Sequence, residues 1–197
     1  MRSLLLLLAF TAPLFADCTS SMYPAQTKSM EFRQTTKSFL GESVFRLAWS
    51  DRRVSGNVLT FAETFTPEEG EPRQSIAKYR CKTEGVQPIE ARGTGVQYGN
   101  DLTPGSEWKW SWDGDGISAS YVYHVMKIET VTVPAGTYDA VRIDYTGKAL
   151  SETRGALPEI TGTLWIVEGI GLVKQYDNDP ALGLFPDETT LELIAIE

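Results

Sequence analysis

The feature that most constrains the fold is the regular return of turn-forming residues. Glycine, proline and aspartate recur at short intervals, and the runs between them are rich in β-branched and aromatic side chains. This pattern is typical of antiparallel strands joined by tight turns. No stretch carries a sustained helical repeat of apolar residues, so little helix is expected. The sequence therefore predicts an all-β fold with one antiparallel, strongly curved sheet, in the form of a half-barrel, a barrel or a sandwich.

Strands are expected at residues 31–39, 43–49, 57–65, 75–82, 107–112, 117–133, 138–145, 161–167, 172–176 and 190–196. Surface loops are expected at 67–72, 149–158 and 178–187, where the composition shifts to Pro, Gly and charge. No linker, repeat or low-complexity tract divides the chain. Residues 17–197 are therefore expected to form a single antiparallel β domain.

The N-terminus predicts export. Arg2, the leucines at 4–8 and a small residue, Ala16, before a polar start are typical of a cleavable secretory signal peptide at residues 1–16. The alternative is a transmembrane anchor. It is disfavoured because Pro13 interrupts an apolar stretch shorter than the roughly 20 residues that a spanning helix needs. No later segment is apolar enough to span a membrane, so a periplasmic or extracellular location is expected.

The chain has two cysteines, and their expected state follows from export. In an oxidising compartment Cys18 and Cys81 are expected to form a disulfide that ties the N-terminus to the body of the domain. The alternative is a lipoprotein in which Cys18 is acylated after cleavage. The bulky Phe15 and charged Asp17 just before Cys18 disfavour lipidation, which would also leave Cys81 as an unpaired thiol.

Charge excludes some partner classes. The formal net charge is −8 at pH 7, and removal of the signal peptide makes the mature chain still more acidic. Nucleic acids and anionic membrane surfaces would be repelled, because no Lys/Arg cluster offsets this balance locally. Neither is expected as a partner.

Residues 107–121 predict a hairpin with one aromatic face. Residues 113–116 have the turn sequence Asp-Gly-Asp-Gly, and a four-residue loop there would set Trp108 opposite Tyr121. Strand alternation places the aromatic side chains on one face and polar side chains on the other. The aromatic set extends one position along the second strand. It comprises Trp108, Trp110, Trp112, Tyr121 and Tyr123.

These five side chains have two interpretations. They can line a concave apolar pocket for a lipid or another small hydrophobic ligand, as at the mouths of curved sheets and barrels. They can also be ordinary core, which is the commoner role of such a face. Core packing is therefore the favoured interpretation, and the five residues are the candidate ligand-binding site if the face is open.

Two further hairpins are predicted downstream. Residues 134–137, with the sequence Pro-Ala-Gly-Thr, form the turn of the first, and Gly169 and Gly171 suit the return of the second. In the first hairpin, a register with Val133 opposite Tyr138 also pairs opposite charges. Those pairs are Glu129 with Arg142 and Lys127 with Asp144.

These hairpins carry a family resemblance. The segments TVPAGTYDAVR at 132–142, GTLW at 162–165 and GIGLVK at 169–174 resemble a group of exported bacterial proteins of unknown function. That group shares a VPAGT(Y/F)DA hairpin and a later G(I/V)GLVK return, and PGSEW at 104–108 is similar to a segment found ahead of it. The resemblance covers roughly residues 104–176. It implies a curved antiparallel sheet, sometimes a half-barrel, in the periplasm or on the cell surface, with no catalytic residues assigned.

No motif for catalysis, a cofactor or a metal emerges. Asp113 and Asp115 alternate as in a calcium loop, but His124 occupies the twelfth position, where an EF-hand needs Glu. His124 is the only histidine, so a His-based triad or multi-His metal site is impossible within one chain. The acidic group at Asp177, Asp179, Asp187 and Glu188 is expected in a solvated loop. Paired carboxylates could support hydrolysis, but no pair can be named from the sequence.

The leading functional hypothesis is a non-enzymatic exported β domain of the cell envelope, with a small apolar molecule or another envelope protein as partner. The alternatives are a secreted hydrolase using paired carboxylates and a structural subunit of a surface assembly. A binder predicts an apolar cavity and a hydrolase predicts ionisable side chains that converge in a cleft. An assembly subunit predicts a long uncovered edge strand or flat apolar patch.

Overall fold

One antiparallel sheet contains all the strands of the described chain. The computed structural model describes residues 18–90, 92–179 and 187–197. Its strands are β1 (Met30–Ser38), β2 (Gly41–Ser55), β3 (Val58–Pro67), β4 (Arg73–Lys82), β5 (Gly85–Pro88), β6 (Arg92–Gly95), β7 (Tyr98–Gly99), β8 (Glu107–Gly114), β9 (Ile117–Val133), β10 (Gly136–Ser151), β11 (Gly155–Ala156), β12 (Ile160–Val167), β13 (Gly171–Asp179) and β14 (Asp187–Ile196). None of the described residues is helical.

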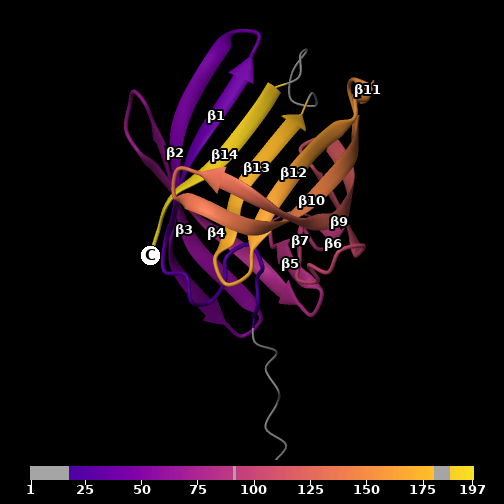
Figure 1. Ribbon diagram of the computed structural model, residues 1–197. Helices are drawn as coiled ribbons and strands as arrows, with labels where there is room; N and C mark the ends of the chain where they lie inside the picture. Colours follow the sequence, from indigo (N-terminus) through magenta and orange to yellow (C-terminus); the bar gives the residue numbers. More distant parts are fainter. Residues whose placement is uncertain (1–17, 91, 180–186) are drawn as a thin grey trace, which may run out of the picture.

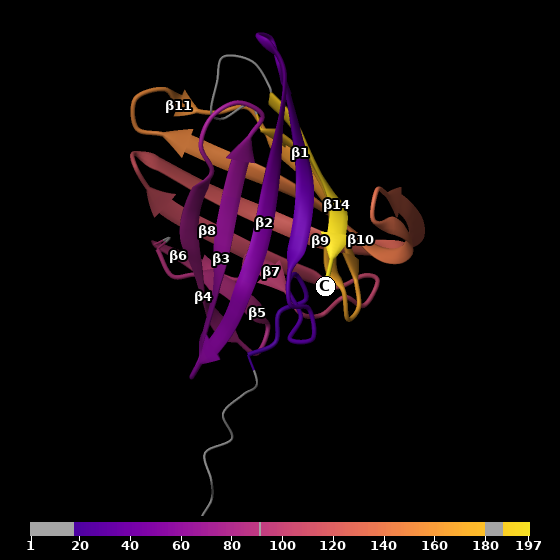
Figure 2. The same cartoon turned by 90° about the vertical axis from the view of Figure 1, so that its left-hand side faces the viewer.

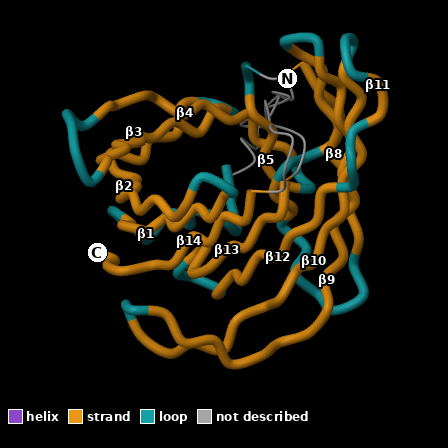
Figure 3. The backbone as a smooth tube through the Cα atoms, turned by 90° about the horizontal axis from the view of Figure 1, so that it is seen from above, coloured by secondary structure: helices purple, strands orange, loops and turns teal. Residues whose placement is uncertain are grey.

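The sheet is curled and open. Its strand order is β6-β8-β9-β10-β12-β13-β14-β1-β2-β3-β4-β5-β7, and β11 pairs with β10 beside this path. Seen from above, the strands curl round from β8 and β9 through β12 and β14 to β3 and β4 (Figure 3). The long strands β2 and β3 form one wall, and β9 and β10 cross behind them at a steep angle in the view of Figure 2. The predicted all-β class and curved antiparallel sheet are confirmed, in the form that does not close into a barrel.

The two ends of the sheet meet at a short segment. Residues 92–95 pair with β8, and Tyr98 and Gly99 pair with β5. Between them, the amide of Val96 donates to the carbonyl of Lys109 in β8, and the amide of Gln97 donates to the carbonyl of Val86 in β5. This segment links both edges without a continuous strand ladder, and it brings β7 close to the aromatic strand β8.

The first predicted hairpin forms with a tighter turn than expected. Strand β8 continues to Gly114, and the turn consists of Asp115 and Gly116, with φ of 54° and 72°. Two-residue Asp-Gly turns with positive φ match the twist of antiparallel strands, which is why this turn replaces the predicted four-residue loop. The predicted register was wrong by two residues: Trp108 pairs with Tyr123. An even shift keeps every side chain on its predicted face.

The second hairpin also has a tighter turn than predicted, and its register is shifted. Val133 pairs with Gly136 across a two-residue turn, so the predicted pairing of Val133 with Tyr138 was wrong. The shift puts Lys127 opposite Arg142 and leaves Glu129 diagonal to Arg142, with 3.9 Å between their charged atoms. The arm formed by the turn end of β9 and β10 crosses β12 and β13 to reach β14 (Figure 1), where the amide of Ala135 donates to the carbonyl of Leu193.

The N-terminal segment covers the lower end of the curled sheet in Figure 1. Met22 and Tyr23 are fully buried, and Tyr23 packs edge-on against Phe61 of β3. The predicted disulfide between Cys18 and Cys81 is confirmed, with 5.4 Å between the Cα atoms. It anchors this segment to β4. The predicted signal peptide at residues 1–16 lies outside the described residues, and no helix within them is long and apolar enough to cross a membrane.

All ten predicted strand ranges coincide with observed strands, although the ends differ. The short strands β5, β6, β7 and β11 were not predicted. The loop expected at 67–72 follows β3 directly. The loop expected at 149–158 contains the end of β10 and all of β11, and the loop expected at 178–187 starts inside β13 and continues into residues outside the description.

Candidate functional site

The inward face of β8, β9 and β10 carries a continuous layer of aromatic rings. Trp110 stacks on Tyr121 with 5.3 Å between ring centroids, and Trp108 stacks on Tyr123 at 5.1 Å. Tyr145 of β10 continues the layer, with its ring centroid 5.1 Å from that of Tyr123. These contacts follow from register, because directly paired residues on neighbouring strands point to the same face.

Glycines on the neighbouring strands give the rings room to lie across the sheet. Tyr121 pairs with Gly147, where a Cβ would stand 2.7 Å from the Tyr121 ring. Tyr145 pairs with Gly162 of β12, where a Cβ would overlap the Tyr145 ring. Gly162 in turn pairs with Asp177 of β13. The Tyr145 ring therefore lies over β12, and its hydroxyl donates a hydrogen bond to the carboxylate of Asp177.

Asp177 is an interior carboxylate held by neutral donors. Besides the bond from Tyr145, the side-chain amide of Gln175 donates to Asp177 Oδ2 at 2.7 Å. Burial, together with the nearby charge of Asp179, raises the pKa of Asp177 to about 7. The prediction that Asp177 and Asp179 lie in a solvated loop was wrong, because β13 extends through both residues and turns them toward the interior.

A cavity of about 280 Å³ lies between these strands. Trp110, Tyr121, Tyr123 and Tyr145 line it from β8, β9 and β10, and Tyr98 of β7 lines it from the other end of the sheet. The rest of its lining includes the apolar side chains of Ile160 and Leu164 and the polar side chains of Gln97, Gln175, Asp177, Asp179 and Thr189. The site therefore combines aromatic and apolar walls with carboxylate and amide groups.

Two polar atoms in the cavity wall lack hydrogen-bond partners. The indole N–H of Trp110 and the Oε1 of Gln97 are buried and bond to nothing in the described part of the chain. Such groups are costly to bury unless something satisfies them. The tyrosine hydroxyls, in contrast, remain neutral: burial raises the pKa of Tyr123 and raises that of Tyr98 well above its ordinary value. They can donate or accept hydrogen bonds at any physiological pH.

Of the five predicted site residues, three line the cavity and two do not. Trp110, Tyr121 and Tyr123 line the cavity. Trp108 lies behind Tyr123, and its indole N–H donates to the carbonyl of Gln97 at 3.4 Å. Trp112 lines a separate groove beside β6. Reasoning from sequence missed the contributions of β7, β10 and β13, although Tyr145 follows from a correct β9–β10 register.

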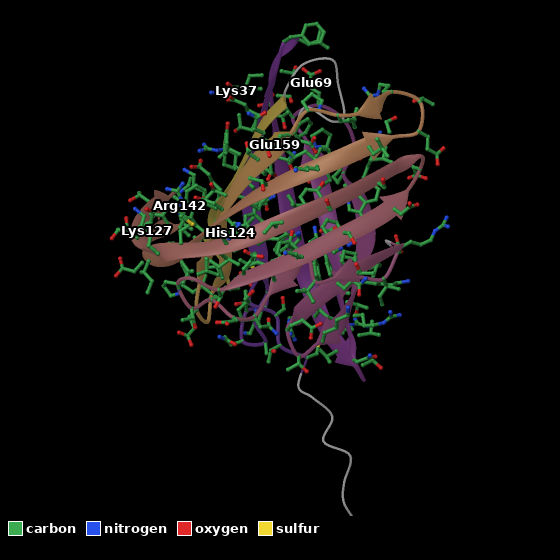
Figure 4. All side chains as sticks on the ribbon, turned by 90° about the vertical axis from the view of Figure 1, so that its right-hand side faces the viewer. Lys37, Glu69, His124, Lys127, Arg142 and Glu159 are labelled. Carbon is green, nitrogen blue, oxygen red and sulfur yellow. A yellow bond between two sulfur atoms is a disulfide. The ribbon has the colours of Figure 1, made fainter. Side chains whose placement is uncertain are left out.

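The outward face of the same hairpin carries charged groups instead. Lys127 and Arg142 lie together where the β9–β10 arm bends (Figure 4), and Arg142 forms an ion pair with Asp144 at 2.8 Å. The indole N–H of Trp165 donates to Glu129 at 2.8 Å. His124 is half-exposed, with Nδ1 3.3 Å from Glu107. These contacts make this face a partly exposed ion-pair network.

The acidic turn considered for calcium is an ordinary hairpin turn. Asp115 occupies its first central position, with φ of 54°. Within residues 18–90, 92–179 and 187–197, no three His, Cys, Asp or Glu side chains are grouped closely enough to hold a metal ion.

This chain resembles known proteins more in its fold than in its sequence. A family model described as DUF3108-like matches residues 123–182, which include both hairpins that carry the resemblance noted from the sequence. A crystal structure from Bacteroides fragilis, described as an exported protein with a YmcC-like fold, superposes with a TM-score of 0.56 at 13% identity, covering 89% of this chain and 98% of that one. One from Parabacteroides distasonis, described as a lipoprotein, superposes with a TM-score of 0.56 at 14% identity, covering 92% and 100%.

A search of curated proteins found no match. The two structural likenesses establish that the curled antiparallel sheet is a fold that other proteins share over almost their whole length.

Proposed function

We propose that this chain is an exported, non-enzymatic binding domain of the cell envelope, whose interior cavity holds a small ligand with an apolar body. The observation that carries the proposal is the aromatic cavity of about 280 Å³ inside the curled sheet. Export is supported by the N-terminal sequence and by the descriptions of the two similar structures, one as an exported protein and one as a lipoprotein.

Several properties of the cavity favour ligand binding over simple core packing. Ligand sites are typically apolar hollows with a few convergent polar groups, and volumes begin at about 300 Å³. This cavity is close to that limit, which suits a small molecule. The unpartnered Trp110 N–H and Gln97 Oε1 in its wall would gain hydrogen bonds from a ligand. A core packed for stability alone would leave less empty space between its side chains.

Native mass spectrometry of the mature protein purified from its own host tests the proposal. We expect a small-molecule adduct on the wild type. Trp110→Ala should lose it, because this side chain lines the cavity, and the matched variant Trp165→Ala should keep it, because Trp165 is not part of the lining and its indole bonds to Glu129 on the outward face. Titration of an apolar fluorescent probe provides a second measurement. A wild type with neither an adduct nor probe binding would rule out a ligand cavity.

Hydrolysis is a second candidate, favoured by one observation. Asp177 and Asp179 both line the cavity, and burial raises the pKa of Asp177 to about 7, a value suited to a general acid. Chromogenic glycoside and ester substrates would test it. Turnover that Asp177→Asn abolishes would support hydrolysis over binding.

The geometry gives less support to a structural subunit that assembles edge to edge. The edge strands β6 and β7 are four and two residues long, and short edges offer few free backbone groups for pairing with another chain.

A further inference from the structure

The inference concerns the chemical class of the ligand, and it rests on the proposed binding function. The two carboxylate oxygens of Asp177 accept hydrogen bonds from Tyr145 and Gln175, which are both neutral. Among the described residues, no Lys, Arg or His forms an ion pair with Asp177, and the only cationic residue outside them is Arg2 in the predicted leader. Within the described residues, the carboxylate of Asp177 therefore has no cationic side chain as its partner.

The segment between β13 and β14 does not change this conclusion. Residues 180–186 have the sequence PALGLFP, which contains no charged side chain. A carboxylate that is withdrawn from water without a cationic partner is costly, and a bound cation would offset that cost.

The cavity walls favour the same class of ligand. Trp110, Tyr121, Tyr123 and Tyr145 surround the space near Asp177, and the faces of aromatic rings carry partial negative charge that attracts cations. Rings combined with a carboxylate form the arrangement that proteins use to hold ammonium groups. The carboxylate of Asp177 and the negative faces of the rings would repel the charged head of a fatty acid or another anionic amphiphile. Anionic ligands are therefore disfavoured.

We infer that the cavity binds an organic cation, a small apolar molecule that carries a protonated or quaternary ammonium group, with the ammonium against Asp177 and the aromatic rings. The apolar body lies toward Ile160 and Leu164, and Trp110 N–H and Gln97 Oε1 are available to polar atoms of the ligand.

The inference also predicts how binding depends on pH. The ionisable groups around Asp177 are Tyr98 of β7, Tyr121 and Tyr123 of β9, Tyr145 of β10 and Asp179 of its own strand. Burial raises the pKa of Tyr98, Tyr121 and Tyr123, so these hydroxyls stay neutral and the carboxylates control the charge. Burial raises the Asp177 pKa to about 7, so ionised Asp177 becomes the main form as the pH rises past that value. Affinity for a quaternary ammonium, which does not titrate, should therefore rise with pH.

The test compares three probes of one shape: choline, the neutral isostere 3,3-dimethylbutan-1-ol and the anion 3,3-dimethylbutanoate. Binding to the mature protein is measured by quenching of tryptophan fluorescence and by calorimetry. At pH 8.5 we expect choline to bind at least about tenfold more tightly than the alcohol, and the anion not to bind, since one desolvated charge contact accounts for a factor of this size. Choline affinity should fall about tenfold at pH 5.5.

Asp177→Asn removes the negative charge of the site and nearly preserves the shape of the side chain. It should reduce the choline preference to about twofold or less and leave the affinity for the neutral alcohol nearly unchanged, whereas the exposed control Asp113→Asn should behave as wild type. Equal affinity of the wild type for choline and the alcohol would overturn the cation inference and leave the binding function standing. The same holds if Asp177→Asn keeps the preference. A wild type that binds no probe and carries no adduct would overturn both.

Discussion

Asp177→Asn should make the folded protein more stable at pH 8 and have little effect at pH 4. The carboxylate of Asp177 is held in the interior by neutral donors, and burial raises its pKa from an ordinary value of 3.8 to about 7. The folded state therefore holds this proton more strongly than the unfolded chain does. The stabilisation from that proton is complete below pH 3.8 and is lost as the pH rises to about 7.

The size of the effect follows from the pKa. Each pKa unit corresponds to about 1.4 kcal/mol, so ionisation of Asp177 costs the folded state about 4 kcal/mol above pH 7. Asn removes that cost and still accepts the hydrogen bond from Tyr145. Its amide N–H₂ faces the amide of Gln175, which must turn over to present its oxygen. We therefore expect a net gain of about 2 to 4 kcal/mol at pH 8 and less than about 1 kcal/mol at pH 4.

Urea unfolding followed by tryptophan fluorescence, at pH 4 and pH 8, measures both values. The exposed Asp113→Asn removes the same charge and should change stability by less than about 0.5 kcal/mol at either pH. If Asp177→Asn shifted the unfolding midpoint equally at both pH values, the charge of Asp177 would not be the cause. If it destabilised the protein at pH 8, the picture of an uncompensated interior carboxylate would be refuted.

Three further predictions concern the framework of the site. Gly162→Ala should displace the Tyr145 ring from β12 and cost about 1 to 3 kcal/mol, with probe binding weakened as well; unchanged binding would show that Tyr145 does not need this glycine. Gly136→Val should cost about 1 to 3 kcal/mol, because Gly136 has φ of 150°, which β-branched residues avoid, and an unchanged denaturant midpoint would contradict this. The intact mass before and after reduction and alkylation should show one disulfide between Cys18 and Cys81, whose removal should cost about 2 to 4 kcal/mol; free thiols or an acylated cysteine in the mature protein would refute it.

Local patterns in the sequence determined the strands and the faces of their side chains. Alternating residues with Gly, Pro and Asp between them predicted the long strands, and the Asp-Gly-Asp-Gly sequence at 113–116 marked the place of a hairpin turn, although not its length. The aromatic face of β8 and β9 was predictable although the register was wrong by two residues, because a shift of two leaves each side chain on the same face. The disulfide was predictable because the chain has only two cysteines and its N-terminal sequence predicts export.

The tertiary structure alone decided which residues share the cavity. Tyr98, Tyr145 and Asp177 come from β7, β10 and β13, and only the curl of the sheet and the missing side chains of Gly147 and Gly162 bring them together with Trp110. The sequence did not predict the interior position of Asp177, because an acidic Asp-Asn-Asp segment has the composition of a solvated loop. Composition also does not show which strands lie across the cavity from it. Strand alternation is a property of neighbouring residues, whereas burial and the pKa of a carboxylate depend on groups that are distant in sequence.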